Sequence, residues 1–197
     1  KILLGNRYVG VELFSLNGDD GADLVTIEKK NNELIILNKE KRGSFEKIID
    51  KADKKLPIFL TINNNHVIHK EIEGIDVLDS KLFHKAFVNI KIEDFLYQIW
   101  RLDNRSIIAI CRKSYIDELL LKTKQYGIQV SSINIGMCGI SHIKDFLTYK
   151  VETNTQTINI ESDLILLQNA DNKSIKIYDV NGLDVQNTYL LAFSNVL

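Results

Sequence analysis

The chain has 197 residues, of which 45% are hydrophobic and 26% are charged, so it can bury the core of one large or two small globular domains. Its formal net charge of −1 gives it no electrostatic attraction to nucleic acids or to an anionic membrane, and we predict no nucleic-acid partner. No apolar run reaches the ~18–20 residues that span a bilayer, and the first residues lack the apolar core of a signal peptide.

The first part of the chain is predicted to form three antiparallel strands. Residues 8–14, 23–29 and 33–38 are short runs rich in apolar residues, and turn-forming Asn, Asp and Gly residues separate them. Ser44 then stands where a helix cap is expected. The helix that it starts is predicted to bury an apolar stripe formed by Phe45, Ile48, Ile49 and Ala52.

A β-hairpin is predicted next, from strands over 58–62 and 66–71 that three asparagines join. His66 and His69 lie three residues apart on the second strand, so their side chains point to opposite faces and we predict no metal site. The pattern weakens over 74–90. Four apolar residues there fit either a short helix or an irregular loop: Leu82, Phe83, Ala86 and Phe87.

The most regular stretch is a β/α unit that alternates helices with buried strands. Ser114 and Asp117 have the spacing of a capping box, and Gly127 has the position of a helix C-cap. Apolar spacing and the run SIIAICR indicate the remaining elements. The unit is predicted to consist of helices over 93–102 and 115–126 and strands over 106–112 and 128–135.

The last part of the chain is predicted to repeat the pattern of the first. A helix is expected over about 139–147, and 152–156 is polar and turn-like. Three strands follow, over 157–160, 163–167 and 174–178, and a final helix starts near Asp184. Because both ends of the chain combine a strand meander with a helix, the sequence suggests a duplicated α/β architecture.

This order of elements resembles the actin-like ATPase superfamily, and within it the PilM and GspL branch. Members of that branch are cytoplasmic proteins of type IV pilus and type II secretion platforms at the inner membrane. The similarity is carried by 106–136, where a strand, Arg112-Lys113, a helix, a Tyr-Gly-Ile turn and a strand follow one another. It implies an α/β fold of the actin-like (ribonuclease H-like) type. The subdomains would be 1–73 with 136–155, an inserted unit over 74–135, and a truncated second half over 156–197.

Active members of the superfamily bind ATP between two halves, and each half offers an acidic residue and a glycine-bearing turn. Glycine leaves room for backbone N–H groups to reach a phosphate. In the stretch similar to the first of these turns, Glu12 replaces the acid and Phe14 replaces the glycine. In the stretch similar to the second, Gln168 and Ala170 stand at the two positions. The resemblance therefore implies a degenerate nucleotide site, with no cofactor and no catalytic residues.

An aromatic set on the predicted inserted unit has two interpretations. Phe83, Phe87 and Trp100 fit a buried core, and if exposed they fit a groove for a partner peptide. The resemblance implies two partners: the cytoplasmic tail of an inner-membrane assembly protein, and an assembly ATPase. It places the chain in the cytoplasm at the inner-membrane face, and it leaves a dimer open. Cys111 and Cys138 have no CxxC spacing, which is typical of reduced thiols in that compartment.

We therefore predict a non-catalytic scaffold or adaptor in a pilus or secretion platform. Two alternatives stay open. The first is an active ATPase or a sugar-kinase-like phosphotransferase of the same superfamily, against which Phe14 and Ala170 argue. The second is an unrelated α/β domain in which these positions are ordinary strand ends.

Overall fold

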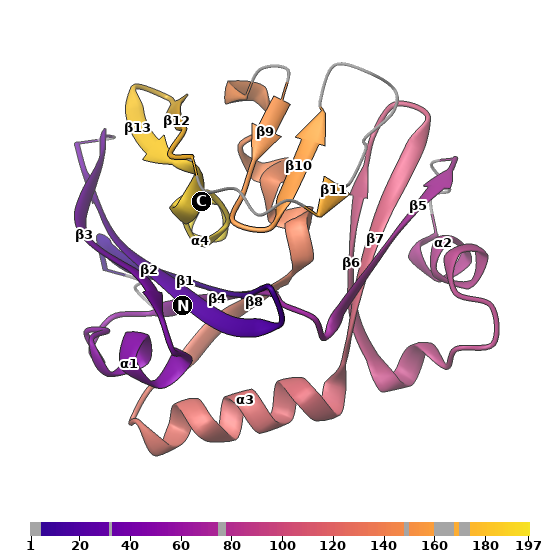
Figure 1. Cartoon of the computed structure of the whole chain (residues 1–197), viewed down its shortest axis with the longest axis horizontal. Helices are drawn as coiled ribbons and strands as arrows, with labels where there is room; N and C mark the ends of the chain where they lie inside the picture. The colour runs from indigo at the N-terminus through magenta and orange to yellow at the C-terminus, as the bar shows by residue number, and fades with distance from the viewer. Residues whose placement is uncertain (1–4, 32, 75–77, 148–149, 160–167, 170–173) are drawn as a thin grey trace.

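The computed structural model describes residues 5–31, 33–74, 78–147, 150–159, 168–169 and 174–197. Its centre is a five-stranded sheet in the order β3-β2-β1-β4-β8 (Figure 1). The first three strands are antiparallel to one another, and β4 and β8 run parallel to β1, so the predicted meander is confirmed. The strands are β1 (Arg7–Leu16), β2 (Asp19–Lys30), β3 (Glu33–Gly43), β4 (Ile58–Asn63) and β8 (Val130–Ile135).

Two helices cover one face of this sheet (Figure 1). Helix α1 (Phe45–Asp50) begins as predicted, because the Ser44 side chain accepts a hydrogen bond from the Lys47 N–H, and its predicted apolar stripe is buried. Helix α3 (Lys113–Gln125) has Tyr126 as its C-cap, and Gly127 follows it with a φ of +72°. The predicted capping box at Ser114 is wrong, because the helix already includes that residue and its N-cap is Arg112, with no side-chain bond.

The inserted unit is a separate three-stranded antiparallel sheet in the order β5-β7-β6, with α2 against one face (Figure 1). The predicted hairpin between β4 and β5 is wrong, because both edges of β4 are already paired, with β1 and with β8. The residues 82–87 form α2 and its C-cap, which resolves the alternative between helix and loop. The elements of the inserted unit are β5 (Val67–Glu73), α2 (Asp79–Ala86), the 3₁₀ turn η1 (Ile92–Asp94), β6 (Phe95–Arg101) and β7 (Arg105–Arg112).

The predicted helix over 93–102 is wrong, because that segment contains strand β6. Alternate side chains of this strand enter two different cores. Leu96 and Trp100 pack into the main core, whereas Phe95, Tyr97 and Ile99 pack against the core under α2. A strand that is apolar on both faces has no alternating pattern, so its sequence can mimic helical spacing.

The opposite face of the five-stranded sheet is covered by the rest of the chain (Figure 1). Residues 136–146 form short 3₁₀ helices and not the predicted α-helix. The predicted strand over 163–167 lies outside the described residues, and Asp184 lies in a strand and not at a helix start. The elements are η2 (Gly136–His142), η3 (Lys144–Phe146), β9 (Lys150–Glu152), β10 (Gln156–Asn159), β11 (Gln168–Asn169), β12 (Ile177–Val180), β13 (Leu183–Gln186), η4 (Asn187–Tyr189) and α4 (Leu190–Ser194).

Helix α4 lies directly on the five-stranded sheet, and all five of its residues are buried. Thr61 donates a hydrogen bond to the Leu191 carbonyl over 3.2 Å. Gly10 lets the two backbones approach, since a Cβ at this position would lie 2.1 Å from the Ala192 carbonyl oxygen. Helix α4 near the end of the chain therefore shares one core with β1 and β4. In the described part of the chain, no helix is both long and apolar enough to cross a membrane.

The close approach of α4 to β1 predicts that Gly10→Ala destabilises the protein. Because the added methyl group would meet backbone atoms, we expect the free energy of unfolding to fall by about 1–3 kcal/mol in urea denaturation. Gly5→Ala is the control, since nothing lies within 4 Å of a Cβ at that exposed residue. Equal midpoints for the two variants would contradict the docking of α4 on β1.

Candidate functional site

Two buried carboxyl groups lie side by side on the central sheet. Glu12 on β1 and Asp23 on β2 are direct cross-strand partners, and both side chains are inaccessible to solvent. They lie on the face of the sheet that α4 covers, because Gly10, two residues before Glu12, contacts Ala192. Two adjacent acids without solvent need hydrogen-bond donors or protons to be tolerated.

One amide group supplies most of this need. The side chain of Asn154, in the turn between β9 and β10, donates from Nδ2 to Glu12 Oε2 over 3.2 Å and to Asp23 Oδ2 over 2.8 Å. The same nitrogen lies 3.0 Å from the Thr188 carbonyl oxygen. Asn63 donates from Nδ2 to Glu12 Oε1 over 3.2 Å. We call Glu12, Asp23, Asn63 and Asn154 the carboxyl–amide cluster.

The cluster holds a proton near neutral pH. Burial, and then the neighbouring charge of Asp23, raise the pKa of Glu12 to about 8, against the opposing effect of the two asparagines. Burial also raises the pKa of Asp23, to about 6, while its bond from the Arg42 N–H at 2.5 Å favours the ionised form. The pair therefore carries one proton and one negative charge around pH 7.

Phe14 fills the space beside the β1–β2 turn. Its ring is buried, and it packs over Gly21, the cross-strand partner of Phe14 on β2. A Cβ on Gly21 would lie 2.8 Å from the ring, so the glycine makes room for it. The ring thus covers the strand end at the position where the resemblance places a phosphate-admitting glycine.

The second predicted nucleotide position lies elsewhere. Gln168 belongs to β11 and pairs with Thr157 of β10, and Ala170 lies outside the described residues. The turn that faces Glu12 is the β9–β10 turn, with Asn154 at its centre. Sequence reasoning treated this segment only as a polar turn. A signal was available: the run Thr153-Asn154-Thr155 stands at the first turn of the β9-β10-β11 meander, as Asn17-Gly18 stands at the first turn of the N-terminal one.

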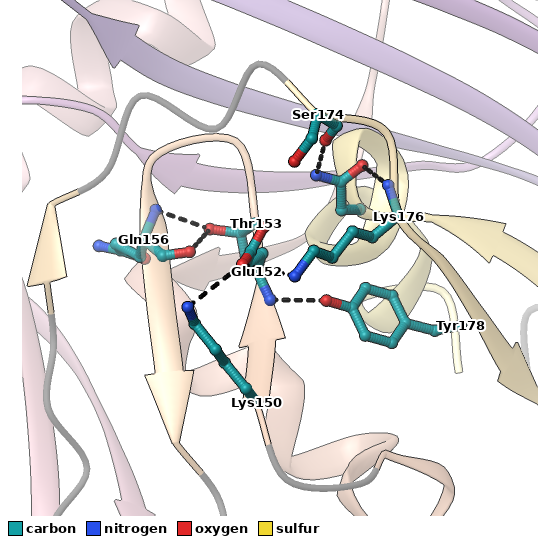
Figure 2. A network of polar contacts seen from close by, with 8 residues as sticks. Lys150, Glu152, Thr153, Gln156, Ser174, Lys176 and Tyr178 are labelled. Atoms are coloured by element: carbon teal, nitrogen blue, oxygen red, sulfur yellow. Dashed lines mark hydrogen bonds and ion pairs between the residues drawn. The ribbon is translucent and has the colours of Figure 1, made fainter.

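A second polar network, centred on Glu152, also holds the β9–β10 turn in place (Figure 2). Glu152 accepts from Lys176 Nζ over 2.7 Å and lies 3.5 Å from Lys150 Nζ. The backbone N–H of Glu152 donates to the Tyr178 hydroxyl over 2.7 Å. Burial opposes the ionisation of Glu152, but the bonds and charges of the two lysines outweigh it and lower its pKa. Asn154 is therefore positioned by the β12–β13 hairpin as well as by the central sheet.

The three aromatic residues considered for a partner groove belong to the core. Phe83 and Phe87 are 0% and 3% exposed, with ring centroids 5.5 Å apart in the core under α2. Trp100 is 2% exposed in the main core. Their burial favours the core alternative and leaves no ring of this set on the surface for a partner.

An open cavity of about 390 Å³ lies next to the carboxyl–amide cluster. We call it the polar cavity. It is bounded by the β1–β2 turn, the segment 63–65, the start of β5 and the β9–β10 turn, and among the described residues no Lys, Arg, Asp or Glu lines it. Its polar lining includes Ser15, Asn17, Asn63, Asn65, His69 and Thr155.

No metal centre is found within the described ranges, where no three His, Cys, Asp or Glu side chains gather in a way that could hold an ion. The two histidines that were weighed as ligands have separate partners. His66 stacks on Tyr115 with ring centroids 3.7 Å apart, whereas His69 accepts from the Met137 N–H over 3.2 Å.

No protein-family model matches the sequence, and no curated protein matches it. Solved structures do superpose on this protein. A chain of the PilM–PilN type IV pilus biogenesis complex superposes with a TM-score of 0.51 at 12% identity, over 81% of this chain and 59% of that one. The cytoplasmic domain of EpsL, an inner-membrane component of the Vibrio cholerae type II secretion system, gives 0.47 at 11% identity over 91% and 71%. A Bacteroides thetaiotaomicron protein with an actin-like ATPase fold gives 0.40 at 12% identity over 93% and 70%.

The first of these likenesses shows the fold, because its TM-score exceeds 0.5 while its sequence identity is low. The chain has an actin-like α/β fold, as its sequence predicts. It spans 59% of the length of the PilM–PilN chain that it matches.

The raised pKa of Glu12 predicts a stability that declines with pH. The folded protein holds this proton more tightly than the unfolded chain, so the contribution is complete below about pH 4.5 and is lost as the pH rises toward about 8. Glu12→Gln keeps a neutral group and should remove this part of the decline. We expect the difference in unfolding free energy between variant and wild type to change by on the order of 3 kcal/mol across this range.

Urea denaturation at a series of pH values measures this difference. Glu152→Gln is the control of opposite sign, since the lowered pKa of Glu152 gives stability that is lost only as the pH falls. That variant should lose stability near pH 7 and keep the alkaline decline. Parallel pH profiles for wild type and Glu12→Gln would show that Glu12 is not protonated in the fold.

Proposed function

We propose that this chain is a non-catalytic, actin-like scaffold in a pilus or secretion assembly platform, at the cytoplasmic face of the inner membrane. The observation that carries the proposal is the carboxyl–amide cluster. Asn154 donates to Glu12 and Asp23. By analogy with an active relative, we propose that the phosphates of ATP would lie beside this cluster. A triphosphate there would have to displace these bonds.

Sterics and charge support the same conclusion. The Phe14 ring occupies the strand end beside the β1–β2 turn, so backbone N–H groups cannot be approached as they are in a glycine turn. The neighbouring polar cavity has no basic residue to balance phosphate charge in the part of its lining that the structure describes. A protonated Glu12 is also a poor ligand for Mg²⁺, which prefers ionised carboxylates and water.

The fold supports a role in an assembly. The structure that this chain resembles at a TM-score of 0.51 is a complex of two pilus biogenesis proteins, PilM and PilN. By analogy we propose that this chain binds the cytoplasmic tail of an inner-membrane assembly protein and communicates with an assembly ATPase. The analogy rests on fold, so the partner must be tested directly.

The proposal predicts that the purified protein has no saturable affinity for Mg-ATP. Isothermal titration calorimetry with Mg-ATP and Mg-ADP should give only heats of dilution for the wild type. Phe14→Gly removes the ring and should be the variant most able to gain affinity, whereas Phe14→Leu keeps apolar bulk and should not. Micromolar binding by the wild type would defeat the proposal and favour the ATPase or sugar-kinase alternative.

The scaffold role predicts capture of one kind of partner. The chain is co-expressed with a membrane protein that is encoded by a neighbouring gene and has a short cytoplasmic tail. The chain should then co-sediment with inner-membrane vesicles. Deleting the tail should release it. Co-sedimentation that persists without the tail would argue that the vesicles retain the chain in another way.

A further inference from the structure

His69 is held by two features of the backbone that fix its ring. The Met137 N–H donates to Nε2 over 3.2 Å. Gly136, with a φ of +62°, leaves the space for this contact, because a Cβ there would lie 2.0 Å from Nε2. Any other residue at 136 would have both an unfavourable backbone conformation and a clash with the imidazole. The ring position is therefore built into the fold.

This arrangement decides which ring nitrogen carries hydrogen. Since Nε2 accepts the Met137 bond, the hydrogen of the neutral ring is on Nδ1. Burial lowers the pKa of His69 to about 4, so the ring stays neutral near pH 7. No described residue accepts a bond from Nδ1. His69 thus lines the polar cavity as an uncharged ring of one tautomer, with its hydrogen on Nδ1.

Other lining groups add to this capacity. Thr155 Oγ1 accepts from Asn63 over 3.3 Å, which leaves its hydroxyl hydrogen for an acceptor in the cavity. The exposed amides of Asn17 and Asn65 each provide a donor and an acceptor. Ser15 is already occupied, since it donates to Asp20 and accepts from the Asn65 N–H. The described part of the lining therefore offers several donors and no charged side chain.

The lining selects a ligand by exclusion. A phosphate or carboxylate would lose hydration with no cation from the described lining residues to compensate it. No Phe, Tyr or Trp is among those residues, so a nucleobase finds no such ring of theirs to stack on. Uncharged acceptors with nearby donors remain, and peptide groups have this composition. Each peptide group has one N–H donor and one carbonyl acceptor, and these can pair with the acceptor and donor of an asparagine side-chain amide.

We propose that the polar cavity binds the main-chain carbonyl groups of an uncharged peptide segment, with His69 Nδ1, Thr155 and Asn65 as the contacting groups. In the proposed scaffold this segment belongs to the tail of the membrane partner, so the inference rests on the proposed function. The cleft that binds nucleotide in an active relative would then be a peptide-binding site in this protein.

The test observes the His69 ring directly. In protein labelled with ¹⁵N-histidine, long-range ¹H–¹⁵N spectra should assign the hydrogen of free His69 to Nδ1. Titration with the neutral peptide Ac-Gly-Ser-Asn-Gly-Ser-NH₂ to millimolar concentration should shift that nitrogen saturably. The charged peptide Ac-Gly-Asp-Asn-Asp-Ser-NH₂ should not shift it. A response to the charged peptide or to the disaccharide trehalose in place of the neutral peptide would overturn the inference.

Variants locate the site. Thr155→Val and Asn65→Ala each remove one contacting group without a buried change in volume, and each should weaken peptide binding about five-fold, as expected for one hydrogen bond. Gln125→Ala removes an exposed amide at the end of α3 and should have no effect. Unchanged affinity in both cavity variants, or no response to any peptide, would overturn the assignment. Failure of peptide binding without Mg-ATP binding defeats this inference alone, whereas Mg-ATP binding defeats the proposed function as well.

Discussion

A single amide group, that of Asn154, satisfies two buried carboxyl groups that belong to a segment 131 and 142 residues away. Without this donor, Glu12 would keep the bond from Asn63 and Asp23 the bond from the Arg42 N–H, and the second oxygen of each carboxyl group would lose its partner. Leaving a buried charged group without its partner costs several kcal/mol, more than most single contacts provide. The constraint therefore fixes where the β9–β10 turn lies relative to the central sheet.

The rest of the second layer follows from that position. The ion pair of Glu152 with Lys176 and the bond from the Glu152 N–H to the Tyr178 hydroxyl join β9 to the β12–β13 hairpin, and this hairpin leads into α4. Helix α4 then covers the sheet where Gly10 allows close approach. Phe14 and the cluster occupy the strand ends, and the polar cavity with the fixed His69 is what remains open. Acids, amides and one aromatic ring therefore fill this part of the sheet.

The sequence predicted best those elements whose turns are local. The N-terminal meander follows from turn residues that adopt left-handed conformations, Asn17, Gly18 and Asn31, and α1 follows from Ser44. The sequence predicted poorly those elements whose type or pairing is decided by tertiary contacts. Strand β6 looks helical because two cores share its side chains, and β5 cannot pair with β4 because β1 and β8 occupy both edges.

The site was predicted in part for the same reason. Glu12 and Phe14 are recognisable because they depart from a local motif. Asp23 carries no local signal, and the polar run around Asn154 indicates a turn without indicating its partners. Both roles depend on a cross-strand register and on a turn brought back from far along the chain. Partner-groove residues chosen for aromatic character are in the core, since a large ring is as typical of a core as of an interface.

A double-mutant cycle between Asn154→Ala and Asp23→Ala tests the central claim most directly. If the shared amide holds the second layer to the sheet, the two changes should be coupled by about 1.5–3 kcal/mol in unfolding free energy, as expected for a hydrogen bond to a charged group. Additive effects of the two substitutions would contradict the account, because they would show that Asn154 and Asp23 contribute to stability independently.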